Sequence, residues 1–577
     1  MTKESTEDIL TSDHEACAEL VEVLVGQGVR HAVISPGSRN APLIVAFARE
    51  KRVEKHVIVD ERSAAFVAVG IAQSTGEPVA VVCTSGSAVL NYAPAAAEAY
   101  YRQLPLIFVS ADRPAEWIDQ NDSQTVRQPG ALGNVVKHTC DIPAMTDAAN
   151  AGWWVNRMVN EAAILAKRAP MGPVHINVQL AEPLCGTRRR VNGKARIIEN
   201  VETMLHARYD IADECIDAIC STKRVMIVAG VMPHDDELER TLASLSLMQN
   251  VVVLTETISN IAGERIITNI DRTLSAIPAG EEADYAPDLL ITMGGALVTR
   301  MLKQFLRSNP PKEEWRIGID HNVIDTMQHL TKRIEVDVPE FFSQMQAGIE
   351  SEPGKKTKSR YATMWRYARR AAWERHKRYI ATAPWSDLKA FATFMPMIIN
   401  GTDLHLSNGT SIRYAQLFEC RHLHRSYCNR GVAGIDGSTS TALGSSLVTT
   451  DRNTLLITGD MSLSYDISGL ASQYNSARFK IVVMCNGGGG IFRFIKGPSE
   501  LEELEQYFEV NRDLPIRKYA EAFGFGYYEA RSEEELRMVT GNFFFESRAA
   551  ILAIYTPNTV NADVLRGYFA AIRGNKE

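Results

Sequence analysis

The sequence lacks the patterns that mark membrane proteins, secreted proteins and metal–thiolate proteins. It has no run of about 18 apolar residues, so we expect no transmembrane helix. Its first residues are polar and acidic, without the apolar core of a signal peptide. The nine cysteines are scattered and form no Cys-x-x-Cys pair, which argues against a zinc site or a redox dithiol. These absences predict a cytoplasmic protein with reduced thiols.

An excess of positive charge is absent too, as are short internal repeats and low-complexity tracts. The formal net charge is −7, so the sequence predicts no general attraction to nucleic acid or to an anionic membrane. Charged residues make up 23% and hydrophobic residues 45%, which is typical of a soluble globular protein. With 577 residues the chain is too long for one core, and several domains are expected.

What the chain does contain is three blocks in which short β-branched runs alternate with helical patterns, which is typical of a parallel α/β sheet. The expected strands are 31–34, 56–59, 79–83, 106–109 and 174–178 in the first block and 225–228, 251–254, 289–293 and 316–319 in the second. We predict an α/β protein of three doubly wound parallel-sheet domains, at 1–190, 200–350 and 385–577. A polar connection containing Arg188-Arg-Arg190 and a basic, helix-prone connection over 350–380 would join them.

The third block contains the stretch around which the chemistry is organised. Gly459-Asp460 ends one apolar run, and Asn486 ends the next and precedes four glycines, 487–490. The pattern predicts a β–α–β unit with a crossover helix within 462–478. Its parallel strands would bring Asp460 and Asn486 together at the carboxyl edge of the sheet, where open α/β folds bind ligands. Either half alone favours a turn or a loose loop. Both halves together favour a magnesium site completed by phosphate oxygens.

Four arginines stand at or near predicted strand ends: Arg39, Arg113, Arg413 and Arg430. Each one alone could be a surface residue, and Ser35-Pro-Gly-Ser-Arg39 could be a turn with a helix cap. Guanidinium groups pair with carboxylates through two hydrogen bonds. Four of them in comparable positions indicate a pocket for more than one carboxylate.

Gly459-Asp460 with Asn486 resembles the metal–diphosphate motif of the thiamine diphosphate enzyme family. The resemblance implies pyrimidine-binding, central and diphosphate-binding domains, in that order along the chain. It implies that Asp460, Asn486 and the carbonyl of Gly488 hold Mg²⁺, with Mn²⁺ as a substitute, and that Gly459 helps to bind the cofactor.

The same resemblance gives roles to two residues that are unremarkable alone. Glu61, in Asp60-Glu61-Arg62, is otherwise an acid at a helix start, where a carboxylate suits the dipole. The family places a glutamate here to hydrogen-bond N1′ of the aminopyrimidine and so activate the cofactor. Ile435 would be the apolar wedge that holds the cofactor bent.

Further stretches resemble the menaquinone-biosynthesis branch of this family; they include Ala111-Asp-Arg-Pro114, Arg127-Gln-Pro-Gly130 and Asn429-Arg-Gly-Val-Ala-Gly-Ile-Asp-Gly437. The implied reaction decarboxylates 2-oxoglutarate and adds the succinyl-semialdehyde carbanion equivalent to isochorismate in a Stetter-like 1,4 manner. Arg413 and Arg430 are implied in catalysis. The implied substrate-binding residues are Ser38, Arg39, Arg113, Gln124, Arg300, Asn408, Arg413 and Arg430, with Ile491, Phe492 and Ile495 as an apolar wall.

The sequence departs from the family pattern at four positions. Cys485 stands where the first asparagine of an Asn-Asn pair is usual, and Met461 stands where many members have glycine. Gly409 stands where a serine is frequent, and Thr299 replaces one member of a basic pair with Arg300. The resemblance also implies active sites built from two chains, so we expect a homodimer or homotetramer.

Two other functions stay open on the sequence alone. The first is another thiamine diphosphate-dependent 2-oxoacid decarboxylase or carboligase, such as an acetolactate synthase type, against which the arginine set argues. The second is a non-catalytic protein that kept the fold, against which Glu61, Asp460 and Asn486 argue together.

Overall fold

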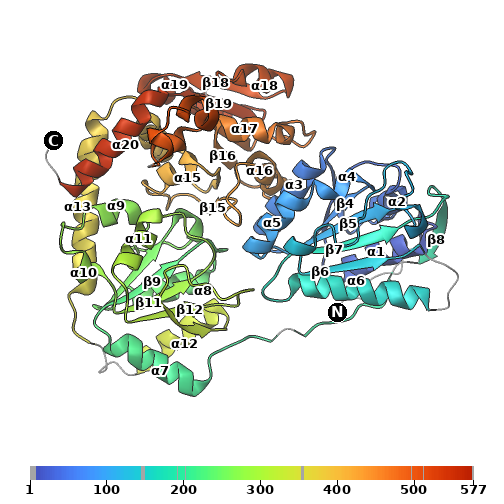
Figure 1. Cartoon of the computed structure of the whole chain (residues 1–577), viewed down its shortest axis with the longest axis horizontal. Coiled ribbons are helices and arrows are strands. Elements are labelled where there is room, and N and C mark those ends of the chain that lie inside the picture. The colour runs from blue at the N-terminus through green and yellow to red at the C-terminus, as the bar shows by residue number, and fades with distance from the viewer. Residues whose placement is uncertain are drawn as a thin grey trace. The chain divides into compact units, whose positions relative to one another are not determined.

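The computed structural model describes residues 8–144, 150–191, 193–201, 203–351, 357–495, 497–510 and 512–574. The chain divides into two compact units (Figure 1). The first unit comprises Met1–Glu202, Gly431–Asp451 and Tyr465–Asn475, and the second comprises Thr203–Arg430, Arg452–Ser464 and Ser476–Glu577. Among the described residues, no helix is both long enough and apolar enough to cross a membrane.

The first unit is built on a parallel sheet with strand order β3-β2-β4-β5-β7-β6. Its strands are β2 (His31–Ile34), β3 (Glu54–Val57), β4 (Val79–Cys83), β5 (Leu106–Asp112), β6 (His138–Ile142) and β7 (Val174–Gln179). Helices α1 (Glu15–Gly26), α2 (Ala41–Arg49) and α6 (Ala151–Lys167) cover one face, and α3 (Glu61–Thr75) and α5 (Ala93–Arg102) cover the other (Figure 1). The short helix α4 (Ser87–Leu90) follows β4. The strand predicted at 56–59 begins two residues earlier, since Glu54 pairs with His31.

The arginine run 188–190 is not a connection, as the sequence indicated, but part of a strand. It lies in β8 (Thr187–Val191), which pairs antiparallel with β1 (Asp8–Ser12). Arg190 also pairs with Glu19 and, at 2.9 Å, with Glu22, both on α1. The run forms a strand because β1 pairs with it and because Glu19 and Glu22 bind Arg190. These partners are distant in the sequence, so the local pattern could not predict them.

Helix α3 packs closely against α16 (Ser438–Val448) within the first unit because two glycines face the partner backbone. A Cβ on Gly70 would lie 2.0 Å from the carbonyl oxygen of Thr441, and one on Gly444 would lie 2.0 Å from that of Val67. Real side-chain carbons do not approach backbone so closely. These glycines set the helix separation, so the two helices cannot accept larger residues there without moving apart.

We expect Gly444→Ala to lower the free energy of unfolding by about 1–3 kcal/mol or more, because the new methyl group overpacks the α3–α16 contact. The matched control is Gly541→Ala in α19 (Glu533–Phe545), where nothing lies within 4 Å of the new Cβ. That change should stabilise the chain slightly, since alanine suits a helix interior better. Thermal unfolding of both variants measures this. An unchanged Tm for Gly444→Ala would contradict the packing argument.

The second unit contains two more parallel sheets, which confirms the predicted three-sheet α/β fold. One has the order β10-β9-β11-β12-β13, with β9 (Val225–Ala229), β10 (Val251–Thr255), β11 (Leu289–Met293), β12 (Glu313–Ile317) and β13 (Leu330–Ile334). The other has the order β15-β14-β16-β17-β19-β18, with β14 (Asp403–Leu406), β15 (Arg425–Tyr427), β16 (Thr454–Gly459), β17 (Phe479–Cys485), β18 (Gly526–Ala530) and β19 (Ala550–Tyr555). The strand predicted at 316–319 begins and ends earlier, as β12. The three domain bounds given above stay a prediction.

The helices of the second unit complete these layers. They are α7 (Tyr209–Ser221), α8 (Asp236–Leu245), α9 (Ile270–Ser275), α10 (Glu282–Tyr285), α11 (Arg300–Ser308), α12 (Val338–Ser351), α13 (Tyr361–Thr382), α14 (Asp387–Phe394), α15 (Thr410–Ala415), α17 (Asp460–Tyr465), α18 (Ile516–Ala522), α19 and α20 (Asn558–Arg573). The predicted helix-prone connection after residue 350 contains α13, while residues 352–356 lie outside the described part of the chain.

The single crossover helix predicted within 462–478 is not present as such. The chain forms α17 and then a short 3₁₀ turn, Ile467–Leu470. Asp466 stands between them and is fully buried. Its carboxylate accepts hydrogen bonds from the backbone N–H of Ser440 at 2.7 Å and from the Ser440 hydroxyl at 2.8 Å. This tertiary contact with the start of α16 interrupts the helix at Asp466, although the sequence pattern predicted one continuous crossover helix.

Candidate active site

Asp460 and Asn486 meet at the carboxyl edge of the second unit's six-stranded sheet. Strands β16 and β17 are parallel neighbours, and Gly459 at the end of β16 pairs in register with Met484. Asp460 is the first residue of α17, and Asn486 directly follows β17. The Asp460 Oδ2 accepts a hydrogen bond from the backbone N–H of Gly487 at 2.9 Å. The juxtaposition expected from the sequence is therefore present.

The Asp460 carboxyl group is only 3% exposed. Its Oδ1 accepts a hydrogen bond from the backbone N–H of Met461 at 2.7 Å, a contact that needs no particular side chain at position 461. Burial raises the pKa of Asp460 to about 7, despite the backbone donors around it. A cation bound here would offset that burial by pairing with the carboxylate.

Asn486 is oriented by Asp387, a residue that the sequence analysis missed. The Asn486 Nδ2 donates to the Asp387 Oδ2 at 2.9 Å, which leaves the amide oxygen of Asn486 to bind a ligand. The Asp387 Oδ1 accepts from the Thr556 hydroxyl at 2.5 Å. Asp387 is 1% exposed and begins α14, about a hundred residues before Asn486. In the sequence, Ser386-Asp387 is recognisable only as the start of a helix. That feature does not predict a contact with Asn486.

The glycine loop after Asn486 adopts conformations that other residues rarely reach. Gly487 has φ of 84° and Gly488 has φ of 137°. The Gly488 carbonyl oxygen accepts a hydrogen bond from the N–H of Gly490 at 2.8 Å. A carbonyl oxygen has two lone pairs, so the predicted role of Gly488 as a metal ligand is compatible with that bond.

A cavity of about 280 Å³ adjoins Asp460 at this edge. Its lining includes Asp460, Gly487, Arg512, Arg531 and Tyr555. The Arg531 guanidinium lies 3.9 Å from the centroid of the Tyr555 ring, so its position is fixed by stacking. Neither arginine was among the predicted site residues, because no recognisable motif surrounds them.

Arg413, Arg430 and Asn408 cluster beyond β14, in the same unit. The Arg430 Nη1 donates to the Asn408 Oδ1 at 2.8 Å. Arg413 donates to the carbonyl of Gly409, the position where the family pattern has serine. Burial lowers the pKa of Arg413, and the neighbouring charges of Arg430 and Arg300 lower it further. The structure thus brings the three arginines into mutual electrostatic range.

Lys303 joins this basic cluster and was missed by the sequence analysis. It lies one turn after Arg300 on α11, and its Nζ donates to the carbonyl of Leu297 at 3.1 Å. Burial lowers its pKa, and the charges of Arg430 and Arg300 act in the same direction. Residues three apart share one helix face. The spacing of Arg300 and Lys303 on a predicted helix could therefore have identified Lys303 as the second basic residue, since Thr299 is not basic.

Glu256 fixes the turn that precedes α11. Its two carboxylate oxygens accept hydrogen bonds from the backbone N–H groups of Val298 and Thr299 at 2.8–2.9 Å. The Thr299 hydroxyl caps the helix by accepting from the N–H of Leu302 at 3.3 Å, and it donates to Asp271. Burial raises the pKa of Glu256 to about 7. Thr299 is therefore a helix cap that sets the direction of α11.

The predicted apolar wall lies directly after the glycine loop. Ile491 and Phe492 are in a 3₁₀ turn, Gly490–Arg493, and Ile495 follows it. All three are partly exposed. The Phe492 ring packs against that of Phe508, with 5.5 Å between centroids. Their place beside the loop fits the prediction, and their role in binding stays a prediction.

In the first unit, Arg39 and Arg113 follow β2 and β5, at the carboxyl edge of that sheet. Arg39 is 5% exposed and lies 3.1 Å from the Glu182 carboxylate. Arg113 lies 2.8 Å from the Asp122 carboxylate. Burial lowers the pKa of Arg39, and the charge of Arg113 lowers it further. The two predicted arginines are thus neighbours, each with an acidic partner.

Gln124 lies beside the turn that follows β4. The Gln124 Nε2 donates to the backbone carbonyl of Ser85 at 3.3 Å, and the backbone carbonyl of Gln124 accepts from the Ser85 hydroxyl at 2.9 Å. Gly86, with φ of 85°, leaves room for the Gln124 side chain. Ser38, on the turn after β2, is exposed. These contacts hold the predicted polar residues of the first unit along one sheet edge.

Glu61 is the first residue of α3, but it does not cap the helix. The Asp60 carboxylate does so by accepting from the N–H groups of Arg62 at 2.9 Å and Ser63 at 3.3 Å. Glu61 is half-buried, and because Asp60 supplies the cap, α3 does not need the Glu61 carboxylate for capping. Burial, then the neighbouring Cys83 and, to a smaller extent, Glu61 raise the pKa of the buried Tyr92.

Ile435 lies in the loop before α16 and is 37% exposed. The start of that loop is held by Glu98 on α5, another residue that the sequence analysis missed. The Glu98 carboxylate accepts from the N–H groups of Gly431 and Val432, each at 2.9 Å. Glu98 is 1% exposed. Its only sequence signal is a glutamate inside an alanine-rich helix, which does not reveal the partner.

The buried carboxylate of Asp460, the oriented amide of Asn486 and the glycine loop together suit a hard cation and a diphosphate group. Three family models agree with this chemistry. "Thiamine pyrophosphate enzyme, N-terminal TPP binding domain" matches residues 15–131, "Middle domain of thiamine pyrophosphate" matches 208–380, and "Thiamine pyrophosphate enzyme, C-terminal TPP binding domain" matches 408–554. Thiamine pyrophosphate is thiamine diphosphate under another name. The chain is a thiamine diphosphate-dependent enzyme.

Its relatives narrow the class to one family. The chain is 43% identical over 568 residues, 98% of each sequence, to the 2-succinyl-5-enolpyruvyl-6-hydroxy-3-cyclohexene-1-carboxylate synthase of Porphyromonas gingivalis. It is 38% identical to the protein of the same name from Flavobacterium psychrophilum, covering 95% of this chain and 97% of that one. For the one from Christiangramia forsetii the identity is 37%, with the same coverage. The chain belongs to the 2-succinyl-5-enolpyruvyl-6-hydroxy-3-cyclohexene-1-carboxylate synthase family, a family of transferases in menaquinone biosynthesis.

Proposed function

We propose that the chain converts 2-oxoglutarate and isochorismate into 2-succinyl-5-enolpyruvyl-6-hydroxy-3-cyclohexene-1-carboxylate and carbon dioxide. The observation that carries the choice of substrates is the basic cluster of Arg300, Lys303, Arg413 and Arg430 in the unit that also holds Asp460. Both substrates carry more than one carboxylate. Binding of such groups offsets the mutual repulsion of these cations, which lowers the pKa of Lys303 and of Arg413 after burial does so.

In this proposal Asp460, Asn486 and the Gly488 carbonyl hold Mg²⁺ or Mn²⁺, and Gly459 lies against the diphosphate. Bound thiamine diphosphate supplies the carbanion chemistry, and the chain supplies placement and electrostatics. Glu61 would share a proton with N1′ of the aminopyrimidine, and Ile435 would support the cofactor from its apolar side. Asp387 keeps the Asn486 oxygen directed to the metal by holding its Nδ2.

The remaining residues bind and orient the substrates. Arg413 and Arg430 neutralise substrate carboxylates close to the reacting carbon and stabilise charge that develops there. Asn408 keeps Arg430 in place through its 2.8 Å hydrogen bond. The other proposed substrate ligands are Ser38, Arg39, Arg113, Gln124 and Arg300, with Ile491, Phe492 and Ile495 excluding water.

Carbon dioxide release from labelled 2-oxoglutarate, with Mg²⁺ and thiamine diphosphate, tests the reaction. Release that depends on isochorismate, with a coupled product, is the expected result. Release without coupling would leave a 2-oxoacid decarboxylase with another acceptor. Turnover of pyruvate without isochorismate would contradict the proposed substrates.

Lys303→Met is expected to raise KM for one of the two substrates by about tenfold or more, since a charged hydrogen bond of about 1.5–3 kcal/mol is lost. Methionine keeps the length and helix propensity of the side chain. Lys312→Met is the matched control, because Lys312 is 81% exposed and pairs only at the surface with Asp288. Steady-state kinetics with each substrate varied measures the effect. An unchanged KM for both substrates would remove Lys303 from the proposed site.

A further inference from the structure

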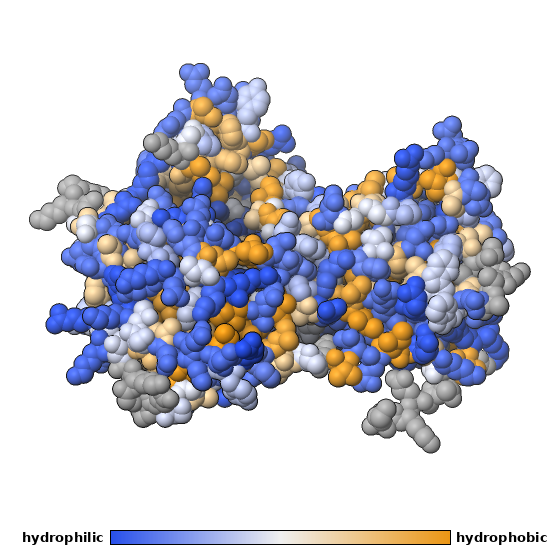
Figure 2. All heavy atoms as spheres, turned by 60° about the horizontal axis from the view of Figure 1, so that its bottom comes forward, coloured by the Kyte–Doolittle hydropathy of each residue, from blue (hydrophilic) through white to orange (hydrophobic). Residues whose placement is uncertain are grey.

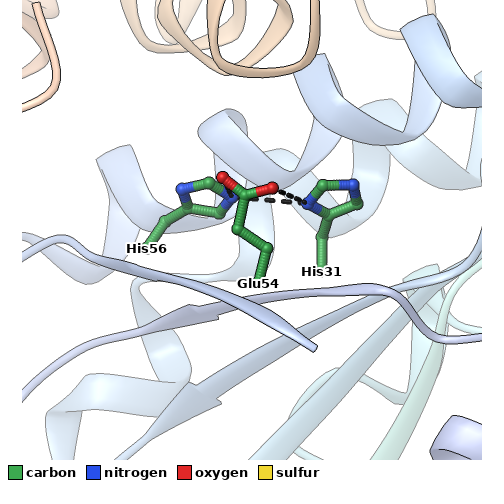
Figure 3. A group of neighbouring side chains, drawn as sticks. All are labelled: His31, Glu54 and His56. Atoms are coloured by element: carbon green, nitrogen blue, oxygen red, sulfur yellow. Dashed lines mark hydrogen bonds and ion pairs between the residues drawn. The ribbon is translucent and has the colours of Figure 1, made fainter. Parts of the chain in front are cut away.

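Three potential metal ligands gather at the edge of the first unit's sheet, on strands β2 and β3. His31 pairs in register with Glu54, and His56 stands two residues further along β3. Side chains two apart on a strand point to the same face, so Glu54 and His56 share a face. Figure 3 shows the Glu54 carboxylate and the two imidazole rings turned toward one another. The candidate ligand atoms of the three residues all lie within 4.8 Å of one another.

The distances suit a tetrahedral ion. The His31 Nδ1 and His56 Nε2 lie 3.4 Å apart. Two nitrogens bound tetrahedrally to zinc at about 2.0–2.1 Å would lie about 3.3 Å apart. The Glu54 Oε2 lies 3.7 Å from the His31 nitrogen, and the Glu54 Oε1 lies 3.9 Å from the His56 nitrogen. The Glu54 side chain is 61% exposed, so it can rotate to bring one of its oxygens near both nitrogens.

We propose that His31, Glu54 and His56 form a binding site for a divalent transition-metal cation, with Zn²⁺ the best match to two imidazoles and one carboxylate. The site lies in the first unit, and its ligands differ from those proposed at Asp460 in the second unit. Three protein ligands leave a fourth position for water, which can enter on the exposed side of Glu54.

The surroundings of His56 favour this assignment. The residue is 2% exposed, and burial lowers its pKa to about 4, so the ring is neutral and its nitrogen lone pair is available. Its ring also meets the Tyr474 ring edge-on, with 5.7 Å between centroids, which fixes the plane of the imidazole. Without an ion, one ring would simply donate a hydrogen bond to the other. That hydrogen bond would not involve the Glu54 carboxylate, whereas a bound ion would contact all three side chains.

The bound ion would tie the edge strand β3 to β2. Only three residues separate the end of β3, Val57, from Glu61. The Val57 N–H donates to the Tyr474 hydroxyl at 2.9 Å, so the strand already has one external tie. Binding of the ion to the folded chain would therefore raise its stability.

Cobalt binding to the full-length chain tests the proposal. The metal-stripped protein is first saturated with Mg²⁺ and thiamine diphosphate, which occupies the Asp460 site. Co²⁺ titration should then give about one equivalent with the visible spectrum of a tetrahedral ion, and Zn²⁺ should displace it. Both His31→Ala and Glu54→Gln should weaken binding, the former by about 100-fold. The exposed carboxylate change keeps the test valid if a histidine variant fails to fold.

His206→Ala is the matched control, because His206 also faces a carboxylate, Glu340, at 3.6 Å, but no third ligand joins them among the described residues. It should bind Co²⁺ like the unaltered chain, as should Asp460→Asn. Tetrahedral binding that is lost in His31→Ala and kept in Asp460→Asn supports the proposal. Weak binding that none of these substitutions changes would show adventitious surface binding and overturn it, as would no binding at all.

Discussion

Glu61→Gln should lower kcat by about 10²–10⁴-fold, the usual contribution of a positioned proton-sharing group. Glutamine has nearly the same shape, and Asp60 caps α3 without help from Glu61. The helix should therefore form normally, and the variant should still bind Mg²⁺ and thiamine diphosphate. The physical reason for the loss is that an amide cannot share a proton with the aminopyrimidine N1′ as a carboxyl group does. Turnover and the cofactor-dependent rise in Tm are the two measurements.

Glu77→Gln is the control for this change. Glu77 is an exposed carboxylate just beyond the other end of α3, so the same chemical change is made without touching the site. It should leave both turnover and cofactor binding unchanged. Full activity in Glu61→Gln would refute the proposed activation. Loss of cofactor binding together with activity would assign Glu61 to binding and not to proton sharing.

Asp460→Asn should abolish the rise in Tm that Mg²⁺ and thiamine diphosphate together produce. A ligand at 100 times its Kd stabilises a protein by about 2.7 kcal/mol, and this gain depends on the carboxylate that pairs with the metal. Without metal, both oxygens of Asp460 accept backbone hydrogen bonds, from Met461 and Gly487. An amide offers only one acceptor oxygen, so the metal-free variant should be less stable by about 1–3 kcal/mol and unfold at a somewhat lower temperature.

Thermal unfolding with and without the metal and cofactor separates these two expectations. Glu534→Gln, an exposed carboxylate change on α19, is the control and should keep the full cofactor response. An undiminished response in Asp460→Asn would place the metal elsewhere. A large drop in the metal-free Tm would indicate that Asp460 has a structural role of its own.

The two inactive variants together test the proposed homo-oligomer. If each site combines Glu61 of one chain with Asp460 of another, a mixed dimer of Glu61→Gln and Asp460→Asn contains one unaltered site. Random reassociation of equal amounts should then restore about a quarter of the activity. No restoration, or an active monomer in sedimentation, would contradict a site shared between chains.

The sequence correctly predicted that Asp460 and Asn486 lie together, because the pattern behind that prediction is local. Asp460 and Asn486 each end a buried β-branched run, and neighbouring parallel strands always place such ends at one edge. The strands were predicted for the same reason. Beyond the described geometry, the roles of these residues rest on the family and on the experiments above.

Residues that orient the site could not be predicted in this way. Asp387 reaches Asn486, and Glu98 reaches the loop of Gly431, only because distant segments fold together. Lys303 could have been found, since it lies one turn after Arg300 on α11. The juxtaposition of His31, Glu54 and His56 depends on the register between β2 and β3. That register could not be predicted from the sequence of either strand.

The sequence by itself determined the class of fold, the order of its three sheets and the meeting of Asp460 and Asn486 at the carboxyl edge of the second unit's six-stranded sheet. These follow from periodicity and from residue chemistry, which act over a few neighbouring positions. Only the tertiary structure decided that the crossover from β16 to β17 is a short helix followed by a 3₁₀ turn, and that residues 188–190 lie in strand β8. It also decided which buried carboxylates, Asp387 and Glu98, orient the site residues. Each of these depends on a hydrogen bond or ion pair between segments far apart in the chain, and the free energy of such a contact exists only once both segments are in place.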